Sequence, residues 1–343
     1  MSIDNSKKNH SVTIYDVAKA SGVSYSTVSR VLNGFQYVKG STRERVLSAA
    51  DQLGYVANLQ ARSLAGGRSN IIGILVPTID SSYITEIVGG IDDELAKVNY
   101  NLMLYTTHRH VGKESEYVSA ITQGMTDGML LVLPLAPSSY LNALSERGFP
   151  YVVIDQNDPT GEGSVVDATN RLGAYEAIEY LINLGHRRIG FITGLLEVRS
   201  THERIEGYKA ALTDHQIPVD ETYVVLGNFW EQEGYQATQK LLQHPQPPAA
   251  IFASNDLSAF GAMAAVRDNG LSIPEDVSIV GFDDLPQAAY VHPKLTTVRQ
   301  PLEQMGRTAV RLLMEKLDHP DRYPKHVTLA TELILRESCQ PPS

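Results

Sequence analysis

Residues 24–34 read SYSTVSRVLNG, a stretch that combines an apolar helical face with a dense set of hydroxyl groups. Val28, Val31 and Leu32 follow the spacing of one face of a helix. Serine and threonine favour the caps of helices over their interiors, and Ser24 stands where it can cap this helix. The stretch therefore predicts a short helix that buries its valines and leaves a polar face, headed by an aromatic residue, outside.

Two more short helices are predicted, one on each side of this stretch. Residues 13–16 have the capping-box pattern with an aspartate at its last position, and the helix that they open is broken at Gly22. A second box at residues 41–44 opens a helix that Gly54 closes. The expected apolar face of that helix consists of Val46, Leu47, Ala50 and Leu53.

Three short helices with a tight turn at residues 20–23 predict a helix-turn-helix. In that motif the second helix enters the major groove of DNA with its amino-terminal end. Tyrosine, serine and threonine can contact base edges or phosphates there, and Arg30 can offer two parallel donors to a guanine. A small three-helix bundle that binds another protein is the alternative that the helix pattern alone leaves open.

Positive charge is concentrated at the start of the chain. Residues 1–68 hold nine lysines and arginines against four aspartates and glutamates, whereas the whole chain has a net charge of -10. A basic head on an acidic body is typical of a protein whose head binds phosphates. Chance clustering on a solvated surface would explain the charge by itself, but together with the helix pattern it favours DNA.

The composition limits what else the chain can be. A length of 343 residues with 43 % hydrophobic content predicts two or three domains. The first residues lack the apolar core of a signal peptide, and no apolar run reaches the length of a membrane span, so we expect a cytoplasmic protein that binds no membrane. Cys339 is the single cysteine, which excludes an intrachain disulfide and a cysteine-based zinc cluster.

The sequence lacks the motifs of common enzyme classes. It contains neither a G-x-G-x-x-G fingerprint, nor a P-loop, a G-x-S-x-G elbow or an H-E-x-x-H pair. His108 and His110 could bind a metal, but two histidines without further ligands rarely make a site, and a polar loop explains them. We therefore expect no catalytic residue, no metal and no cofactor.

The rest of the chain alternates apolar runs with amphipathic stretches. The runs IIGILV, NLMLYT, GMLLVL and YVVID precede Thr169, and the pattern restarts after it with RIGFITG, YVVLG, AIFAS and VSIVGF. Both halves predict a doubly wound parallel sheet. Open sheets of this kind bind ligands at the carboxyl ends of their strands, so two such lobes predict a cleft between them.

Polar and aromatic residues follow several of these strands and are candidates to line the cleft: Asp155, Arg204, Phe229, Asn255, Asp256 and Asp283. Carboxylate, guanidinium and amide groups can each bridge neighbouring hydroxyls, and an aromatic ring can lie on the apolar face of a sugar. Asn255 and Asp256 also fit a helix cap, and we expect Asp256 to be structural. Trp230 competes with Phe229 for the stacking role.

Motifs along the chain resemble one known family. VTIYDVAKASGVSYSTVSRVLNG, STRERV, LGYVAN and ARSLAGGRS are similar to the head of the lactose-repressor (LacI/GalR) family of bacterial transcription regulators. The resemblance continues through GHRRIGFITG, ERIEGYKAAL, AIFASNDLSAFGAM, DVSIVGFDD and LTTVRQP. It implies an α/β fold with a three-helix helix-turn-helix head and a periplasmic-binding-protein-like core of two doubly wound parallel-sheet lobes.

The same resemblance implies how the chain is divided. Residues 12–57 would form the DNA-binding head, residues 58–69 a hinge helix and linker, and residues 70–343 the effector-binding and dimerisation domain. In such a core the chain crosses between the lobes three times, and we expect the crossings near residues 165, 298 and 328. Both lobes would therefore be discontinuous in sequence.

The resemblance also implies the DNA contacts. Tyr25, Ser26 and Arg30 would read bases, and the residues expected to hold phosphates are Ser24, Thr27, Ser29 and Asn33. Two hinge helices would enter the minor groove together, where Leu64 would wedge between base pairs. Ala57 departs from the family, which usually has proline just before the hinge asparagine, so the backbone there is less preset.

By resemblance, the effector site comprises Arg204, Asn255, Asp283, Asp155, Phe229 and Tyr83. The implied function is a homodimeric repressor of carbohydrate-utilisation genes, released from a pseudo-palindromic double-stranded operator by a small sugar-like effector. The alternative from another class is a cytoplasmic sugar-binding protein or enzyme with an ancillary helical head.

Overall fold

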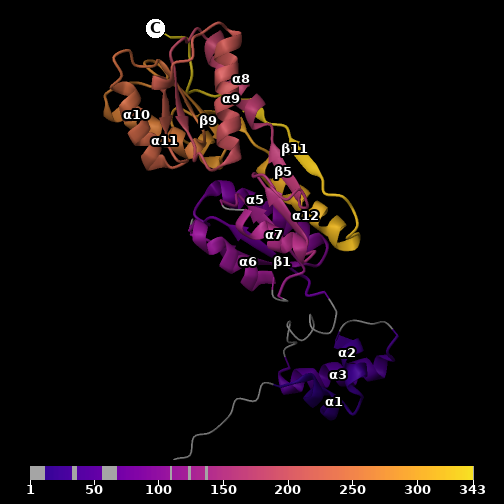
Figure 1. The fold of residues 1–343 in the computed structure, drawn as a ribbon. Helices are drawn as coiled ribbons and strands as arrows, with labels where there is room; N and C mark the ends of the chain where they lie inside the picture. Colours follow the sequence, from indigo (N-terminus) through magenta and orange to yellow (C-terminus); the bar gives the residue numbers. More distant parts are fainter. Residues whose placement is uncertain are drawn as a thin grey trace, which may run out of the picture. The chain divides into compact units, whose positions relative to one another are not determined.

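The computed structural model describes residues 12–32, 37–55, 68–108, 110–122, 125–135 and 138–342. The chain forms two compact units, of which the first ends at Ser69 and the second begins at Asn70 (Figure 1). Within the described ranges, no helix has both the length and the apolar character needed to cross a membrane.

The first unit contains three helices, α1 (Ile14–Ser21), α2 (Tyr25–Leu32) and α3 (Gly40–Leu53). Their shared core consists of Val17, Val28, Val31, Val46, Ala49 and Ala50. The Thr13 amide donates to Asp16 Oδ2 at 2.8 Å, as a capping box requires, and α1 ends at Gly22 with a left-handed φ of 63°. At the start of α2, Ser24 Oγ accepts from the Thr27 amide at 3.3 Å.

The third helix differs from the sequence prediction at its start and on its buried face. It begins at Gly40 with Lys39 as its N-cap, two residues before Ser41, the first residue of the predicted box. Leu47, predicted to be buried, is 48 % exposed because it lies about 100° around the helix from buried Val46. Leu53 lies on the buried face, but in the last turn, where it is 37 % exposed. Ala49, which the prediction omitted, is buried instead.

The second unit consists of two lobes, each built on a six-stranded sheet. The amino-terminal lobe has the strand order β11-β5-β4-β3-β1-β2, all parallel. Its strands are β1 (Ile71–Val76), β2 (Asn101–Thr106), β3 (Gly128–Val132), β4 (Tyr151–Ile154), β5 (Ser164–Ala168) and β11 (His326–Leu329). One face packs against α5 (Ser82–Lys97) and α12 (Leu302–Asp318), and the other against α6 (Glu114–Thr122) and α7 (Ser138–Glu146).

The carboxy-terminal lobe has the order β12-β10-β9-β8-β6-β7. Its strands are β6 (Ile189–Thr193), β7 (Val224–Leu226), β8 (Ala250–Ala253), β9 (Ser278–Asp283), β10 (Thr296–Arg299) and β12 (Glu332–Ile334). Helices α8 (Asn170–Asn183) and α9 (Arg199–Asp214) cover one face, and α10 (Glu231–Leu242) and α11 (Asp256–Asp268) cover the other. Five of these strands pair in parallel, as predicted, and edge strand β12 runs antiparallel to β10.

The chain passes between the lobes at Thr169, at residues 300–301 and at residues 330–331. These positions lie a few residues beyond the predicted ones, because β5, β10 and β11 keep their pairing up to Ala168, Arg299 and Leu329. Two of the passages are in contact, since the hydroxyls of Thr169 and Thr331 are 2.8 Å apart.

The late segment α12 is part of the core of the amino-terminal lobe. Figure 1 shows it, in yellow and with β11, among the purple elements that begin the second unit. A Cβ on Gly90 of α5 would lie 2.1 Å from the Glu303 carbonyl oxygen, and one on Gly306 of α12 would lie 2.3 Å from that of Ile87. Glycine at both positions lets the two helices pack backbone to backbone.

Candidate functional site

The candidate site of the first unit is the exposed face of α2. Tyr25, Ser26 and Arg30 are exposed, while Thr27 and Ser29 are half-buried. The Ser24 hydroxyl lies 2.9 Å from the hydroxyls of both Ser26 and Thr27. Within the parts of the chain that the structure describes, Arg30 forms no ion pair. The amino-terminal end of α2 therefore presents a hydroxyl cluster and an aromatic ring to solvent, and the last turn adds the guanidinium of Arg30.

Tyr15 of α1 extends this surface and was missed by the sequence interpretation. Its ring stacks on that of Tyr25, with centroids 5.0 Å apart and planes inclined by 20°. The signal was present in the sequence, because Tyr15 stands on the side of α1 opposite to Val17, which is buried. An exposed aromatic residue there has no role in the core.

Two of the predicted DNA contacts, Asn33 and Leu64, lie outside the described residues. The same holds for Ala57 and for most of the predicted hinge at residues 58–69. Their roles stay predictions.

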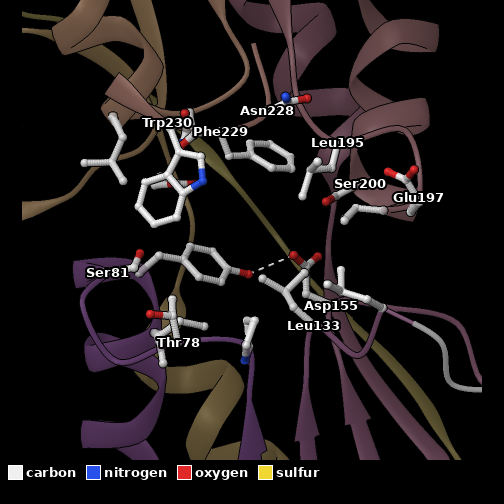
Figure 2. Close-up of a pocket in the computed structure, with 18 of the residues that line it drawn as sticks. Thr78, Ser81, Leu133, Asp155, Leu195, Glu197, Ser200, Asn228, Phe229 and Trp230 are labelled. Atoms are coloured by element: carbon white, nitrogen blue, oxygen red, sulfur yellow. Dashed lines mark hydrogen bonds between the residues drawn. The ribbon is translucent and has the colours of Figure 1, made fainter. Parts of the chain in front are cut away.

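A cavity of about 460 Å³ lies between the two lobes, at the carboxyl ends of both sheets (Figure 2). All six residues predicted for the effector site line it: Tyr83, Asp155, Arg204, Phe229, Asn255 and Asp283. The volume falls in the range of about 300–1,000 Å³ that is typical of sites for small ligands. The sequence interpretation did not single out Ser200, Glu197 and Glu233, which also line the cavity.

Asp155 lines the cavity on the side of the amino-terminal lobe. It follows β4 with a left-handed φ of 55°, which aspartate tolerates better than most residues, and it is only 4 % exposed. The Tyr83 hydroxyl donates to Asp155 Oδ2 at 2.8 Å, the bond drawn in Figure 2. Burial raises the pKa of Asp155 to about 6, although the charge of Arg204 opposes the shift.

Arg204 is fully buried on α9 and is held by groups that the sequence did not identify. Its Nε and Nη2 donate to Asn170 Oδ1 at 3.0 and 2.8 Å, and its Nη1 donates to the Ser254 carbonyl oxygen. The guanidinium carbon lies 3.8 Å from the centroid of the Phe282 ring. Among the described residues no carboxylate pairs with Arg204 at ion-pair distance. The group is thus fixed in position, with part of its donor capacity left for the cavity.

A hydrogen bond joins the side chain of Asn255 to the backbone of Phe229. Asn255 caps α11, because its Oδ1 accepts from the Ser258 amide at 2.9 Å, and its Nδ2 donates to the Phe229 carbonyl oxygen at 2.9 Å. Phe229 has a left-handed φ of 69°, and its ring lies directly over Gly194, where a Cβ would be 1.9 Å from Cζ. Trp230, the next residue, also lines the cavity, and Figure 2 shows both rings.

Asp283 and Asp256 differ in what they face. Asp283 ends β9, lines the cavity and accepts from Gln300 Nε2 at 2.8 Å, and burial raises its pKa to about 7. Asp256 accepts from the Leu285 amide at 2.7 Å and from the Thr297 hydroxyl at 2.6 Å. Burial, and then the charge of Asp283, raise the pKa of Asp256. The hydrogen bonds of Asp256 connect α11 to β10 and to the segment after β9, whereas Asp283 lines the cavity.

The described part of the chain contains no group of three or more histidine, cysteine, aspartate or glutamate side chains arranged to hold a metal ion.

Comparisons with known proteins match both units of the chain. The family described as "Bacterial regulatory proteins, lacI family" matches residues 13–58, and a periplasmic binding protein-like domain matches residues 178–339. The chain is 34 % identical to catabolite control protein A of Priestia megaterium over 328 residues, which cover 95 % of this chain and 99 % of that protein.

Two solved structures extend the likeness. The complex of transcriptional regulator CelR with cellobiose is 33 % identical, with a TM-score of 0.72 over 95 % of this chain and 99 % of that one. The lac repressor dimer bound to operator and the anti-inducer ONPF is 28 % identical, with a TM-score of 0.85 over 96 % of this chain and 100 % of that one.

Regulators of this kind are not enzymes, which decides against the alternative of an enzyme with an ancillary head. The likeness to the lac repressor over 96 % of the chain likewise identifies the fold: a helix-turn-helix head followed by two sheet lobes of the periplasmic-binding-protein type. The chain belongs to the lacI family of bacterial regulatory proteins, and it is a DNA-binding transcriptional repressor of the bacterial cytoplasm.

Proposed function

We propose that this repressor binds a small neutral carbohydrate or related polyol in the cavity between its lobes, and that the ligand releases it from a pseudo-palindromic operator at carbohydrate-utilisation genes. The observation that carries the proposal is the lining of the cavity. It combines buried carboxylates, one buried guanidinium, an amide and aromatic rings. This is the set of groups that binds vicinal hydroxyls and the apolar face of a sugar ring.

The charges of the lining favour a neutral ligand over an anionic one. Arg204 is the one cation among the lining residues, and it already donates to Asn170 and Ser254. Four carboxylates line the same cavity: Asp155, Glu197, Glu233 and Asp283. A phosphate or carboxylate on the ligand would meet like charges in a medium that screens them poorly. Sugar hydroxyls, by contrast, can donate to these carboxylates.

Calorimetry of the full chain tests the ligand class. The panel contains cellobiose and ribose as neutral sugars, glucose 6-phosphate and glucuronate as anions, hypoxanthine as a nucleobase, and glutamine as an amino acid. We expect binding by a neutral sugar and none by the anions. Binding by hypoxanthine or glutamine alone would contradict the carbohydrate proposal.

For DNA, we propose that Tyr25, Ser26 and Arg30, all exposed on α2, read bases in the major groove. The phosphate contacts would come from Ser24, Thr27, Ser29 and Asn33. The lac repressor relative was solved as a dimer bound to operator, which supports a homodimer whose two heads read a twofold-related site. In this dimer the hinge at residues 58–69 would pair in the minor groove.

The proposed division comprises a head at residues 12–57, a hinge at residues 58–69 and a body at residues 70–343. In it, the hinge converts a small movement of the lobes into a large change in DNA binding. A helix of about two turns is marginal alone, so a small change in lobe separation decides whether two hinges pair. A ligand shifts this equilibrium only by its differential affinity for the two lobe orientations. A gel shift on the promoter region of the protein's own gene, with and without the sugar that calorimetry identifies, tests the release.

A further inference from the structure

A cluster of polar side chains joins the two lobes beside the cavity, and Arg199 is at its centre. Arg199 is the first residue of α9 in the carboxy-terminal lobe. Its Nη1 donates to Asn157 Oδ1 at 2.8 Å and to Asp167 Oδ2 at 3.1 Å, and both acceptors belong to the amino-terminal lobe. Its Nε pairs with Glu203 on its own helix at 2.7 Å. We call this cluster the interlobe seam.

The seam leads to the guanidinium in the cavity. Glu203 Oε2 accepts from Asn170 Nδ2 at 3.2 Å, and Asn170 Oδ1 in turn accepts from Nε and Nη2 of Arg204. On the other side, Asp167 Oδ2 lies 2.6 Å from His326 Nε2 on β11. A continuous path of side-chain hydrogen bonds therefore runs from Arg204 through Arg199 into the amino-terminal lobe.

Arg199 pairs with one carboxylate from each lobe. Asp167 and Glu203 come from opposite lobes, and their side chains are only 6 % and 20 % exposed. Arg199 is the cation that pairs with both, and its bond to Asp167 is the one ion pair across the lobes within the described ranges. His326 contacts Asp167 as well, but it is on the same lobe and half-exposed. Without the guanidinium, two poorly solvated carboxylates would face each other.

We propose that Arg199 is a positioning residue that keeps the lobes in the orientation seen here, by neutralising Asp167 and Glu203 together, and that orients Arg204 through Asn170. Arg199 does not line the cavity, so it acts without touching the ligand. The proposal goes beyond the proposed function and does not depend on which ligand the repressor binds. Other bonds between the lobes, such as Gln156 Nε2 to the Glu197 carbonyl oxygen at 3.2 Å, are uncharged and do not replace it.

The separation of the lobes can be followed by the fluorescence of a natural residue of the protein. Trp230 is the single tryptophan of the chain and lines the cavity between the lobes, so acrylamide quenching of its fluorescence reports lobe separation in the full-length protein. We expect Arg199→Gln to raise the Stern–Volmer constant about twofold, because the facing carboxylates drive the lobes apart. The double variant Arg199→Gln/Glu203→Gln removes that repulsion and should return the constant to the wild-type value.

Two further variants separate charge from packing. Arg307→Gln breaks an ion pair with Asp93 that lies wholly inside the amino-terminal lobe, so it should leave quenching unchanged. Arg199→Lys keeps the positive charge and should quench like the wild type. Circular dichroism first establishes that each variant is folded, and if Arg199→Gln does not fold, Arg199→Lys and the double variant decide the matter.

Three results would overturn the proposal. The first is a Stern–Volmer constant for Arg199→Gln that equals the wild-type value. The second is a double variant as quenchable as the single one, which would mean that packing rather than charge balance holds the seam. The third is a Stern–Volmer constant for Arg199→Lys that is raised as much as the constant for Arg199→Gln.

Discussion

Replacing Asp155 by asparagine should stabilise the protein at neutral pH while it impairs the response to ligand. Asparagine has nearly the same shape, tolerates the left-handed φ of 55° and can still accept the bond from the Tyr83 hydroxyl. What it removes is the cost of keeping a carboxylate ionised at a site that is 4 % exposed. The cost is visible as a pKa that burial raises from 3.8 to about 6.

The magnitude follows from the pKa shift. Because the pKa of Asp155 is higher in the folded chain than in the unfolded one, its stabilising contribution is complete below pH 3.8 and is lost as pH rises through 6. At about 1.4 kcal/mol per pH unit, the ionised carboxylate lowers the free energy of unfolding by about 3 kcal/mol above pH 7. With about 2 °C per kcal/mol for a domain of this size, the variant should melt about 6 °C higher there.

Thermal unfolding of the full chain, followed by circular dichroism at pH 4.5, 6 and 8, measures this difference. We expect the gain of Asp155→Asn in Tm to be small at pH 4.5 and largest at pH 8. Asp321→Asn, at an exposed carboxylate, is the matched control and should show no such trend. An equal gain at all three pH values would refute the reasoning, because the gain would then not depend on ionisation of Asp155. A loss at pH 8 would also refute it, because attraction to Arg204 would then outweigh burial.

Three other outcomes test the proposed roles. Arg30→Ala should remove about 1–3 kcal/mol of discrimination between operator and random DNA in gel shifts, whereas Lys39→Ala should weaken both about equally; equal losses for Arg30→Ala would exclude base reading. Arg204→Ala and Asp283→Ala should abolish ligand-induced release in a filter-binding assay yet leave operator affinity nearly intact, and loss of operator binding in both would mark them as structural. Leu64→Gly should reduce DNA bending, measured by circular permutation of the operator, while thermal unfolding of the body stays unchanged.

Local patterns in the sequence predicted the three helices of the first unit and eight strands of the second unit. The spacing of Val28 and Val31 indicated the buried face of α2, and both are in the core of the first unit. The eight apolar runs of the body each coincide with a strand of the structure to within a few residues. Such patterns suffice because the periodicity of a helix or strand, together with its caps, is written in neighbouring residues.

Contacts between distant segments were beyond the reach of these patterns. The sequence offered Arg204 as a cleft residue, but its partner Asn170 stands 34 positions earlier on α8, and its stacking partner Phe282 stands 78 positions later on β9. Nothing local in Asp167 or Arg199 indicates that they meet across the lobes. The antiparallel course of β12 likewise depends on where the chain returns after its last crossing.

The interleaving of the lobes has a consequence for synthesis on the ribosome. The helices of the first unit are made first, but the amino-terminal lobe waits for α12 and β11, which end at Leu329. A nascent chain that stops near residue 300 lacks α12 and leaves the apolar side chains that this helix covers, including Ile87 and Ile91 of α5, exposed to water. Such a product offers cellular proteases an incomplete body behind a finished head. Nonsense mutations between codons 300 and 329 should therefore abolish the repressor rather than yield a form that binds DNA and ignores its ligand.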